Sequence, residues 1–467
     1  MSVVVKKRLL DLLSNEYTSY YDLVSFFQDS NISDFDKEKK SVIFLNHELE
    51  KIGNVDSVLD DDIDNIVEWY KNENRQVCQK YQEYLSRRNS GGQREYFKNI
   101  GQVFEFLIKV SPTKMVDGSW LYSLVHYWND LAFHDLILIY LEELGLGHAQ
   151  SNHVCMYDDL LRLLGLNDFE IFLDDEFYHQ AAIQLALGYA PPEFIPEIIG
   201  FNLGYEQLPL HLLITNYELS ELGINSKYFN VHITIDNLDN GHSYKSLKIL
   251  KKFYVKYKDK DFFIKKIKRG YALNQQGISS TQIIKNLNLE NFVYKILKRK
   301  ALIGQFVHSK KRVIGCKTID QWLAKPSEIE GFIGQLIQDK WIKLNNDPEE
   351  SAFWQLINNV NGKMYGVFSV AERQIIYDWI AGQSHSSQHL SFSQILNKAE
   401  PLHNYLFSYV SDDELENLQS AVNGADNLAF KLCKLTPFLA PNFHHKNVGL
   451  WSTQKYAELL FPYLVSS

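Results

Sequence analysis

Apolar residues recur at helical spacing along most of the chain. Leu9, Leu12 and Leu13 are followed at the same period by apolar residues between 20 and 27, which is typical of amphipathic helices. Residues 87–93 (RRNSGGQ) are typical of a linker, and the helical pattern resumes with Phe97 and Ile100. The chain has 11 prolines and 24 glycines, few enough to suit long helices. The pattern predicts an all-α protein.

Three segments interrupt this pattern. Residues 131–164 form a long apolar stretch with Gly145 and Gly147 inside it, and residues 190–197 (APPEFIPE) are typical of a proline-rich loop. Residues 231–235 (VHITI) are rich in β-branched side chains, which favour a strand when taken alone. Residues 200–223 keep a helical pattern despite Pro209.

The length of 467 residues corresponds to about three domains of ordinary size. Hydrophobic residues make up 45% and charged residues 22%, so the chain can build more than one hydrophobic core. We find no internal repeat and no low-complexity tract. The predicted organisation is an N-terminal helical region (1–90), a central domain (91–300) and a C-terminal helical region (301–467).

The net charge of -9 gives the chain no general attraction for nucleic acid or anionic membranes. Residues 245–269 are rich in lysine with interleaved aromatics, and we interpret them as the solvated face of an amphipathic helix. The four cysteines are scattered without a CxxC pair, which is typical of reduced thiols. With no signal-peptide pattern or membrane-spanning stretch, we expect a cytoplasmic protein.

The chemically informative residues are acids and histidines within or beside apolar segments. Buried carboxylates are costly unless they are paired or bind a metal. Carboxylates with imidazoles, and without thiolates, favour iron or manganese over structural zinc. The candidates are Asp117, Glu142, Glu143, His153, Glu206, Asp236, Asp239 and His242.

Helical spacing alone leaves the ligand set open. Asp239 and His242 share one helix face at i, i+3, whereas Asp236 and His242 would need a π-bulge or a bent turn to join one site. An unbroken helix would align Glu142 with His153 better than Glu143, although Gly145 and Gly147 argue against an unbroken helix. The residues DNLDNGH and GLGHAQSNH also suit ordinary loops.

Several segments together resemble the iron-containing redox enzymes of the haem-oxygenase-like diiron oxidase superfamily. The resemblance covers roughly residues 95–380. The segments that carry it are VDGSWL (116–121), IYLEELGLGHAQSNHVCMYDDLLRLLGL (139–166), GFNLGYEQLPLHLL (200–213), ELGINSKYFNVHITIDNLDNGH (221–242) and RGYALNQQG (269–277).

The resemblance implies a haem-oxygenase-like helical bundle, with additional helical regions on both sides, that binds two iron ions in place of haem. It also implies that residues 231–242 are mainly helical. Position by position, it implies the metal ligands Asp117, Glu143, His153, Glu206, Asp239 and His242, with Asp236 as an alternative or additional carboxylate. His232, four residues before Asp236, is a candidate extra ligand. Relatives often carry Glu where this chain has Asp117, and His148 departs from the pattern before His153.

The implied function is that of a diiron oxidase or oxygenase that uses O2 and an external reductant on a small organic substrate. In this superfamily the reactions are N-oxygenation, C–C cleavage and oxidative decarboxylation. Iron is the expected metal, and manganese suits the same ligands. No catalytic residue beyond the metal ligands is assigned. We expect no nucleic-acid or membrane partner, and a homodimer is compatible with the sequence. The alternatives are a non-enzymatic interaction protein and a haem- or cofactor-binding protein on the same scaffold.

Overall fold

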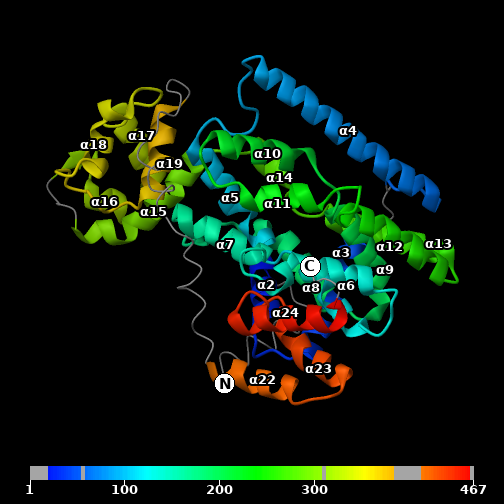
Figure 1. The fold of residues 1–467 in the computed structure, drawn as a ribbon. Helices are drawn as coiled ribbons and strands as arrows, with labels where there is room; N and C mark the ends of the chain where they lie inside the picture. The colour runs from blue at the N-terminus through cyan, green and yellow to red at the C-terminus, as the bar shows by residue number, and fades with distance from the viewer. Residues whose placement is uncertain (1–18, 54–57, 308–311, 383–411, 463–467) are drawn as a thin grey trace.

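The computed structural model describes residues 19–53, 58–307, 312–382 and 412–462 (Figure 1). Over these residues the regular secondary structure is almost entirely helical. The exception is a short antiparallel pair, β1 (Val313–Ile314) and β2 (Lys317–Thr318), in which Val313 lies opposite Thr318. The predicted all-α class is therefore confirmed. No helix in the described part of the chain combines the length and apolar character needed to cross a bilayer.

The helices that surround the candidate site belong to the first two thirds of the chain. Their bounds are α2 (Tyr20–Gln28), α3 (Asp34–Ile52), α4 (Ile63–Asn89), α5 (Ile100–Lys114), η1 (Ser119–Tyr127), α6 (His134–Glu143), η2 (Gly145–Gly147), α7 (His153–Leu164), η3 (Glu170–Phe172), η4 (Asp175–Tyr178), α8 (His179–Gly188), η5 (Pro192–Phe194), α9 (Ile195–Tyr205), α10 (Leu210–Glu221), α11 (Lys227–Ile235), α12 (His242–Lys256) and α13 (Lys260–Asn274).

Apart from α14, which lies beside α10 and α11 in Figure 1, the remaining helices lie at two places in the molecule. In Figure 1, α15 to α19 gather at one side, whereas α22 to α24 lie below the central bundle. Their bounds are α14 (Ser280–Lys285), α15 (Leu289–Val307), α16 (Ile319–Leu323), η6 (Pro326–Glu328), α17 (Ile329–Gln338), η7 (Pro348–Glu350), α18 (Ala352–Asn358), α19 (Val370–Ala381), α22 (Asp412–Asn423), α23 (Leu428–Leu435), η8 (Thr436–Leu439) and α24 (Asn447–Leu460).

Buried apolar side chains form two large clusters. The first draws on residues 23–70, 116–144, 178–203, 247–273 and 418–461, and the second on residues 97–110, 156–172, 208–229 and 283–380. Residues 91–300 therefore contribute to both clusters, and helices from either end of the chain pack against them. The three predicted domain ranges stay a prediction.

Glycines allow the central helices to pack at very short range. A Cβ atom at Gly200 of α9 would lie 2.1 Å from the carbonyl oxygen of Ile267, and one at Gly270 of α13 would lie 2.0 Å from that of Glu197. The backbones of α9 and α13 therefore touch, which a larger residue at either position would prevent. This pairing fixes the direction of α9, the helix that leads to Glu206.

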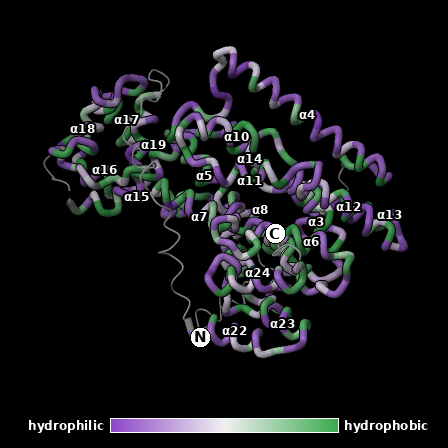
Figure 2. Tube along the Cα trace, in the orientation of Figure 1, coloured by the Kyte–Doolittle hydropathy of each residue, from purple (hydrophilic) through white to green (hydrophobic). Residues whose placement is uncertain are grey.

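Asp62, in the acidic stretch before α4, caps this helix. The Asp62 carboxylate accepts hydrogen bonds from the backbone N–H groups of Asp64 and Asn65, which satisfies donors that the helix itself leaves free. The helix is mostly hydrophilic along its length (Figure 2), and four of its residues are buried: Ile66, Val67, Tyr70 and Tyr84.

The lysine-rich segment 245–269 also follows its prediction as a solvated face. Seven of its lysines lie on α12 and α13 and make ion pairs with acids on neighbouring elements. These pairs are Lys245–Glu142, Lys248–Asp135, Lys251–Asp64, Lys252–Asp135, Lys256–Asp130, Lys266–Glu197 and Lys268–Asp61. Much of the positive charge is therefore neutralised within the molecule.

Residues 231–242 are helical over their first half only. The β-branched run belongs to α11, because burial of Tyr228, Phe229 and His232 overrides its strand propensity. The helix ends at Ile235, and α12 begins at His242. The expectation of a mainly helical segment is therefore wrong for residues 236–241, which form a turn. At Gly241 a Cβ atom would lie 2.0 Å from the carbonyl oxygen of Ile235, so the turn is tight.

Candidate metal centre

The ends of helices position the acids and histidines of the candidate site. Glu143 is the last residue of α6 and His153 the first of α7. Glu206 follows the last residue of α9, Asp236 follows the last residue of α11, and His242 is the first residue of α12. Since the breaks between helices fall at these residues, side chains from separate segments can meet in the interior.

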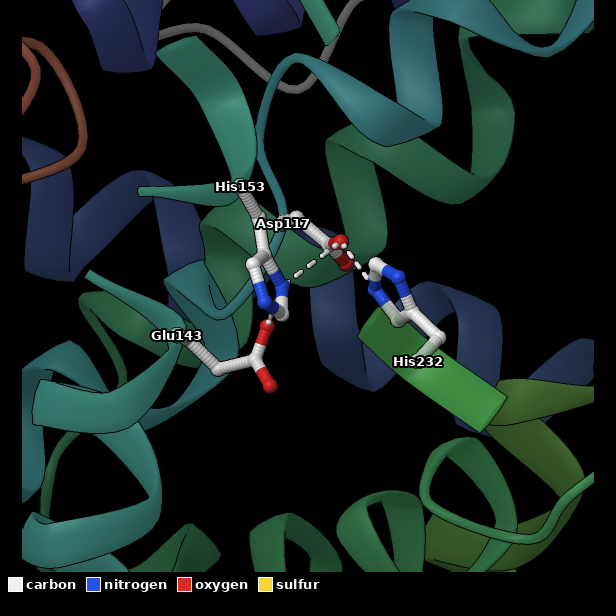
Figure 3. A group of neighbouring side chains, drawn as sticks. All are labelled: Asp117, Glu143, His153 and His232. Carbon is white, nitrogen blue, oxygen red and sulfur yellow. Dashed lines mark hydrogen bonds and ion pairs between the residues drawn. The ribbon is translucent and has the colours of Figure 1, made fainter. Parts of the chain in front are cut away.

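One group of four buried side chains consists of Asp117, Glu143, His153 and His232 (Figure 3). Each offers one ligand atom, and these atoms lie within 4.8 Å of one another. His153 Nδ1 lies 2.5 Å from Glu143 Oε2 and 3.6 Å from Asp117 Oδ2, and His232 Nε2 lies 3.1 Å from the same Asp117 oxygen. Figure 3 shows the Asp117 carboxylate between the two imidazoles.

A second group consists of Glu143, Glu206 and His242, again with ligand atoms within 4.8 Å. His242 Nδ1 lies 3.2 Å from Glu143 Oε1 and 3.1 Å from Glu206 Oε2. Asp236 Oδ1 is 3.5 Å from the same nitrogen, so Asp236 adjoins this group. Glu143 belongs to both groups, with Oε2 facing His153 and Oε1 facing His242. The two groups are therefore adjacent and share one carboxylate.

Neighbouring hydrogen bonds orient the two imidazoles that come from α11 and α12. His242 Nε2 lies 3.0 Å from Glu142 Oε2, which also pairs with Lys245, so the opposite nitrogen, Nδ1, faces the second group. His232 Nδ1 lies 2.8 Å from the carbonyl oxygen of Tyr228, which leaves Nε2 toward Asp117. Metal-binding histidines are usually held in this way through their second nitrogen.

Two tyrosines hold Asp117 in place. The Tyr205 hydroxyl donates to Asp117 Oδ1 at 2.7 Å, and the Tyr228 hydroxyl donates to Oδ2 at 2.6 Å. Burial raises the pKa of both hydroxyls well above the ordinary value, and the nearby Asp117 charge raises it further. Both groups therefore stay protonated and act as donors, and each Asp117 oxygen has a fixed direction.

The electrostatics of the metal-free site favour protonated imidazoles. Burial opposes the charge on His153, but Glu143 and Asp117 outweigh it and raise the pKa of His153 to about 10. The pKa of His242 is likewise raised against burial, mainly by Glu206. Burial and the neighbouring Glu206 raise the pKa of Asp236 well above its ordinary value. For Glu143, the opposing effect of burial is outweighed by His153, which lowers its pKa to about 2.

Three buried atoms of this site make no hydrogen bond within the described residues: His153 Nδ1, Glu206 Oε1 and Asp236 Oδ1. Since native proteins pair nearly all buried polar atoms, each such atom needs an explanation. His153 Nδ1 lies close to Glu143 Oε2 but in a direction that makes no hydrogen bond. Buried nitrogen and oxygen atoms that converge without forming hydrogen bonds with one another fit bound metal ions, to which each atom could donate an electron pair.

Helix dipoles add to this argument. Glu143, Glu206 and Asp236 stand at helix C-termini, where the partial charge is negative, and His153 and His242 stand at N-termini, where it is positive. These positions disfavour both free carboxylates and imidazolium ions. Two divalent cations would neutralise the four carboxylates, including Asp117, and would bind neutral imidazoles. The residues present therefore fit such ions.

The structure brings together every predicted ligand except Asp239. Asp239 is exposed within the 236–241 turn and belongs to neither group. Its prediction as a ligand is corrected, because the i, i+3 spacing to His242 has meaning only in a helix that the chain does not form there. Asp236 takes the place beside His242 instead. His232, considered as an extra ligand from its spacing, lies in the first group.

Residue spacing left open whether Glu142 or Glu143 faces the site. The break after α6 places Glu143 there. Glu143 is 3% exposed and faces both groups, whereas Glu142 contacts the outer nitrogen of His242 and Lys245. An unbroken helix would have favoured Glu142, but Leu144 to Asn152 lie outside α6 and α7. The left-handed conformation of Gly145 and Gly147 permits this path.

A cavity of about 240 Å³ adjoins the site. Glu143, Glu206, His232 and Asp236 form one part of its wall. A volume below the usual range of drug-sized pockets suits a small molecule. Metal ions in the two groups would therefore be reachable from this cavity.

Comparison with protein families gives one match. Residues 104–275 match the model of the family described as "Iron-containing redox enzyme". The resemblance stated from the sequence is thereby confirmed over these residues, which include every side chain of both groups. The match supports an oxidoreductase with an iron site. Comparisons with curated proteins and with solved structures gave no match.

Proposed function

We propose that this chain is a non-haem diiron enzyme that uses O2 to oxidise a small organic substrate. The observation that carries the proposal is that Glu143 belongs to both groups of ligands. One ion would be held by Asp117, His153 and His232, the other by Glu206, Asp236 and His242, with Glu143 available to both. Manganese would suit the same donors. An external reductant would be required for turnover.

The bound ions would supply O2 activation, and the protein residues prepare the site for it. Glu142 and Lys245 hold the His242 ring so that Nδ1 faces the interior. Tyr205 and Tyr228 keep Asp117 in one orientation. The four carboxylates and three imidazoles are at most 6% exposed, so little of the site meets bulk water, and the substrate would approach through the adjoining cavity.

A haem-binding role fits these contacts less well. Each imidazole of the site lies near a carboxylate oxygen, and one axial ligand would leave four buried carboxylates without a counter-charge. A Soret band in the purified protein would nevertheless identify haem directly. A non-enzymatic scaffold would leave the same carboxylates unexplained.

The test is O2 consumption by protein loaded anaerobically with Fe(II) in the presence of a reductant. We expect consumption faster than that of the same amount of free Fe(II), with loss of this excess in Glu143→Ala. Asp239→Ala, which removes an exposed carboxylate from the neighbouring turn, should behave as the wild type. Consumption no faster than that of free Fe(II) would contradict the proposal and favour the scaffold.

A further inference from the structure

The cavity beside the candidate metal centre has walls of different character. Besides the metal-binding carboxylates, its wall includes Lys109, Val110 and Lys114 of α5. Further apolar side chains that line the cavity include Phe177, Leu212 and Ile283. A ligand in this cavity therefore meets apolar surface, lysine side chains and the metal-binding residues within one small volume.

Lys114 is the last residue of α5, and its side chain lines the cavity. Among the described residues, no carboxylate forms an ion pair with Lys114, although it lies in the electrostatic range of Asp117. Its Nζ is 3.4 Å from the Tyr205 hydroxyl and lies over the rings of Tyr205 and Tyr228, 5.5 and 5.7 Å from their centres. Aromatic faces hold a cation in place without neutralising it.

Lys109 lines the same cavity but, unlike Lys114, forms an ion pair with a carboxylate. Its Nζ lies 2.5 Å from Glu105 Oε1, and Glu105 is 1% exposed and also accepts from the backbone of Asn288. The charge of Lys109 is thus already compensated by an acid fixed in the core. Of the two lysines in the cavity wall, Lys114 is the one with charge to offer a ligand.

The charge balance of the site with two metal ions bound also leaves the charge of Lys114 uncompensated. Two divalent ions would neutralise Asp117, Glu143, Glu206 and Asp236, and Glu142 pairs with Lys245 outside the groups. The Lys114 charge is then left over at the cavity. His211, which also lines the cavity, does not add to it, because burial lowers its pKa to about 4 and Lys114 lowers it further.

We infer that Lys114 binds the carboxylate of a small organic acid, which is the substrate class of this site. One leftover positive charge matches a carboxylate, whereas a phosphate monoester carries close to two negative charges. The apolar side chains of the wall would hold the carbon chain, in a cavity that Glu143, Glu206, His232 and Asp236 also line. This inference rests on the proposed diiron function and adds to it the anchor that selects the substrate.

The experiment uses the full chain loaded anaerobically with Fe(II), and the iron content of every variant is measured first. Binding of hexanoate, hexanamide and hexyl phosphate is then followed by calorimetry. We expect hexanoate to bind more tightly than either of the others. Lys114→Met should weaken hexanoate by about ten- to a hundredfold, the usual size of a charge-assisted contact, and leave hexanamide unchanged. Lys114→Arg should restore most of the loss.

Lys109→Met is the matched control, because it removes a neutralised lysine from the same wall, and its hexanoate affinity should stay within a few-fold of wild type. Hexanoate that binds no better than hexanamide, or no worse to Lys114→Met, overturns the inference even if iron binds, and would indicate a neutral substrate or a carboxylate bound by the metal. Preference for hexyl phosphate overturns the carboxylate assignment. A wild-type chain that binds no iron overturns the proposed function and this inference together.

Discussion

Glu206 has a buried carboxylate whose two oxygens have different surroundings. Oε2 lies 3.1 Å from His242 Nδ1, whereas Oε1 makes no hydrogen bond within the described residues. In the metal-free protein this carboxylate adds to the repulsion with Asp236, whose pKa is raised by burial and by Glu206. With a metal ion bound, the same charge is compensated. Under the proposed function the residue is therefore a cost to the empty site and would be a ligand of the filled one.

We expect Glu206→Ala to melt at or above the temperature of wild type without metal, and to lose much of the stabilisation that Fe(II) gives. A ligand at a hundred times its dissociation constant stabilises a protein by about 2.7 kcal/mol, so the effect is measurable. Thermal melting with and without Fe(II) under anaerobic conditions provides the test. Asp239→Ala should keep the full stabilisation, and a Glu206→Ala variant that also kept it would show that Glu206 is not a ligand.

The protonated imidazoles give metal binding a defined pH dependence. The pKa of His153 is raised to about 10 against burial by Glu143 and Asp117, so the metal-free site holds this proton at neutral pH. A metal ion requires the unprotonated nitrogen, and binding must therefore release the proton. Since fewer protons must be displaced at higher pH, affinity rises with pH, by up to about tenfold per unit for each proton released.

We expect Co(II), used as a redox-stable probe, to bind more tightly at pH 8 than at pH 6 and to release protons. Calorimetry in two buffers of different ionisation enthalpy measures this release. Glu143→Gln removes the strongest of the contacts that raise the His153 pKa, so the variant should release fewer protons. Equal affinity at both pH values would contradict the proposed role of His153.

At the scale of elements, the decisive features are the breaks between helices. The sequence pattern predicts a helix correctly from Ile100 onward, where apolar periodicity is strong. The predicted helix is absent at 236–241, because a continuous helix and a tight turn would both bury the residues on either side of this segment. The close approach of Gly241 to Ile235 distinguishes the turn from a helix, and residue spacing along the chain does not reveal that approach. The spacing therefore favoured Asp239 over Asp236, whereas the structure buries Asp236 beside His242 and leaves Asp239 exposed.

Gly241→Ala tests this turn. Its Cβ would overlap the carbonyl oxygen of Ile235, so the turn must open and move Asp236 and His242 apart. We expect a loss of stability of about 1–3 kcal/mol, the usual cost of overpacking, together with weaker Fe(II) binding. Gly334→Ala in α17 is the control, since its Cβ meets nothing within 4 Å and Ala favours a helix. Unchanged iron affinity in Gly241→Ala would contradict the role given to the turn.

At the scale of the whole molecule, the C-terminal residues brace the segment between Glu143 and His153. Asn152 caps α7 through Oδ1, and its Nδ2 donates to the carbonyl oxygen of Leu144 and to His444 Nδ1, at 3.2 and 3.1 Å. Burial and the neighbouring His445 lower the pKa of His444 well below its ordinary value, so its Nδ1 is free to accept. Residues beyond the family match thus support the segment that carries two of the proposed ligands, Glu143 and His153.

Gly147 lies at the contact between this segment and α24. A Cβ atom there would lie 2.4 Å from the carbonyl oxygen of Leu450, so Gly147→Ala should push α24 away and weaken Fe(II) binding. Gly165→Ala is the matched control, because Gly165 also has positive φ but its Cβ meets nothing within 4 Å. Both variants should lose about 1–2 kcal/mol from backbone strain, and loss of iron affinity should be confined to Gly147→Ala. Equal iron affinity in both would contradict the bracing role.

Two metal ions held side by side through Glu143 are the central claim, and iron stoichiometry tests it most directly. Wild type and Glu143→Ala are titrated anaerobically with Fe(II), and bound iron per chain is measured together with Mössbauer spectra. We expect two high-spin ferrous ions per wild-type chain and weakened binding of both in Glu143→Ala, because both groups include this residue. A single ion in wild type, or two ions that the substitution leaves undisturbed, would contradict the shared site.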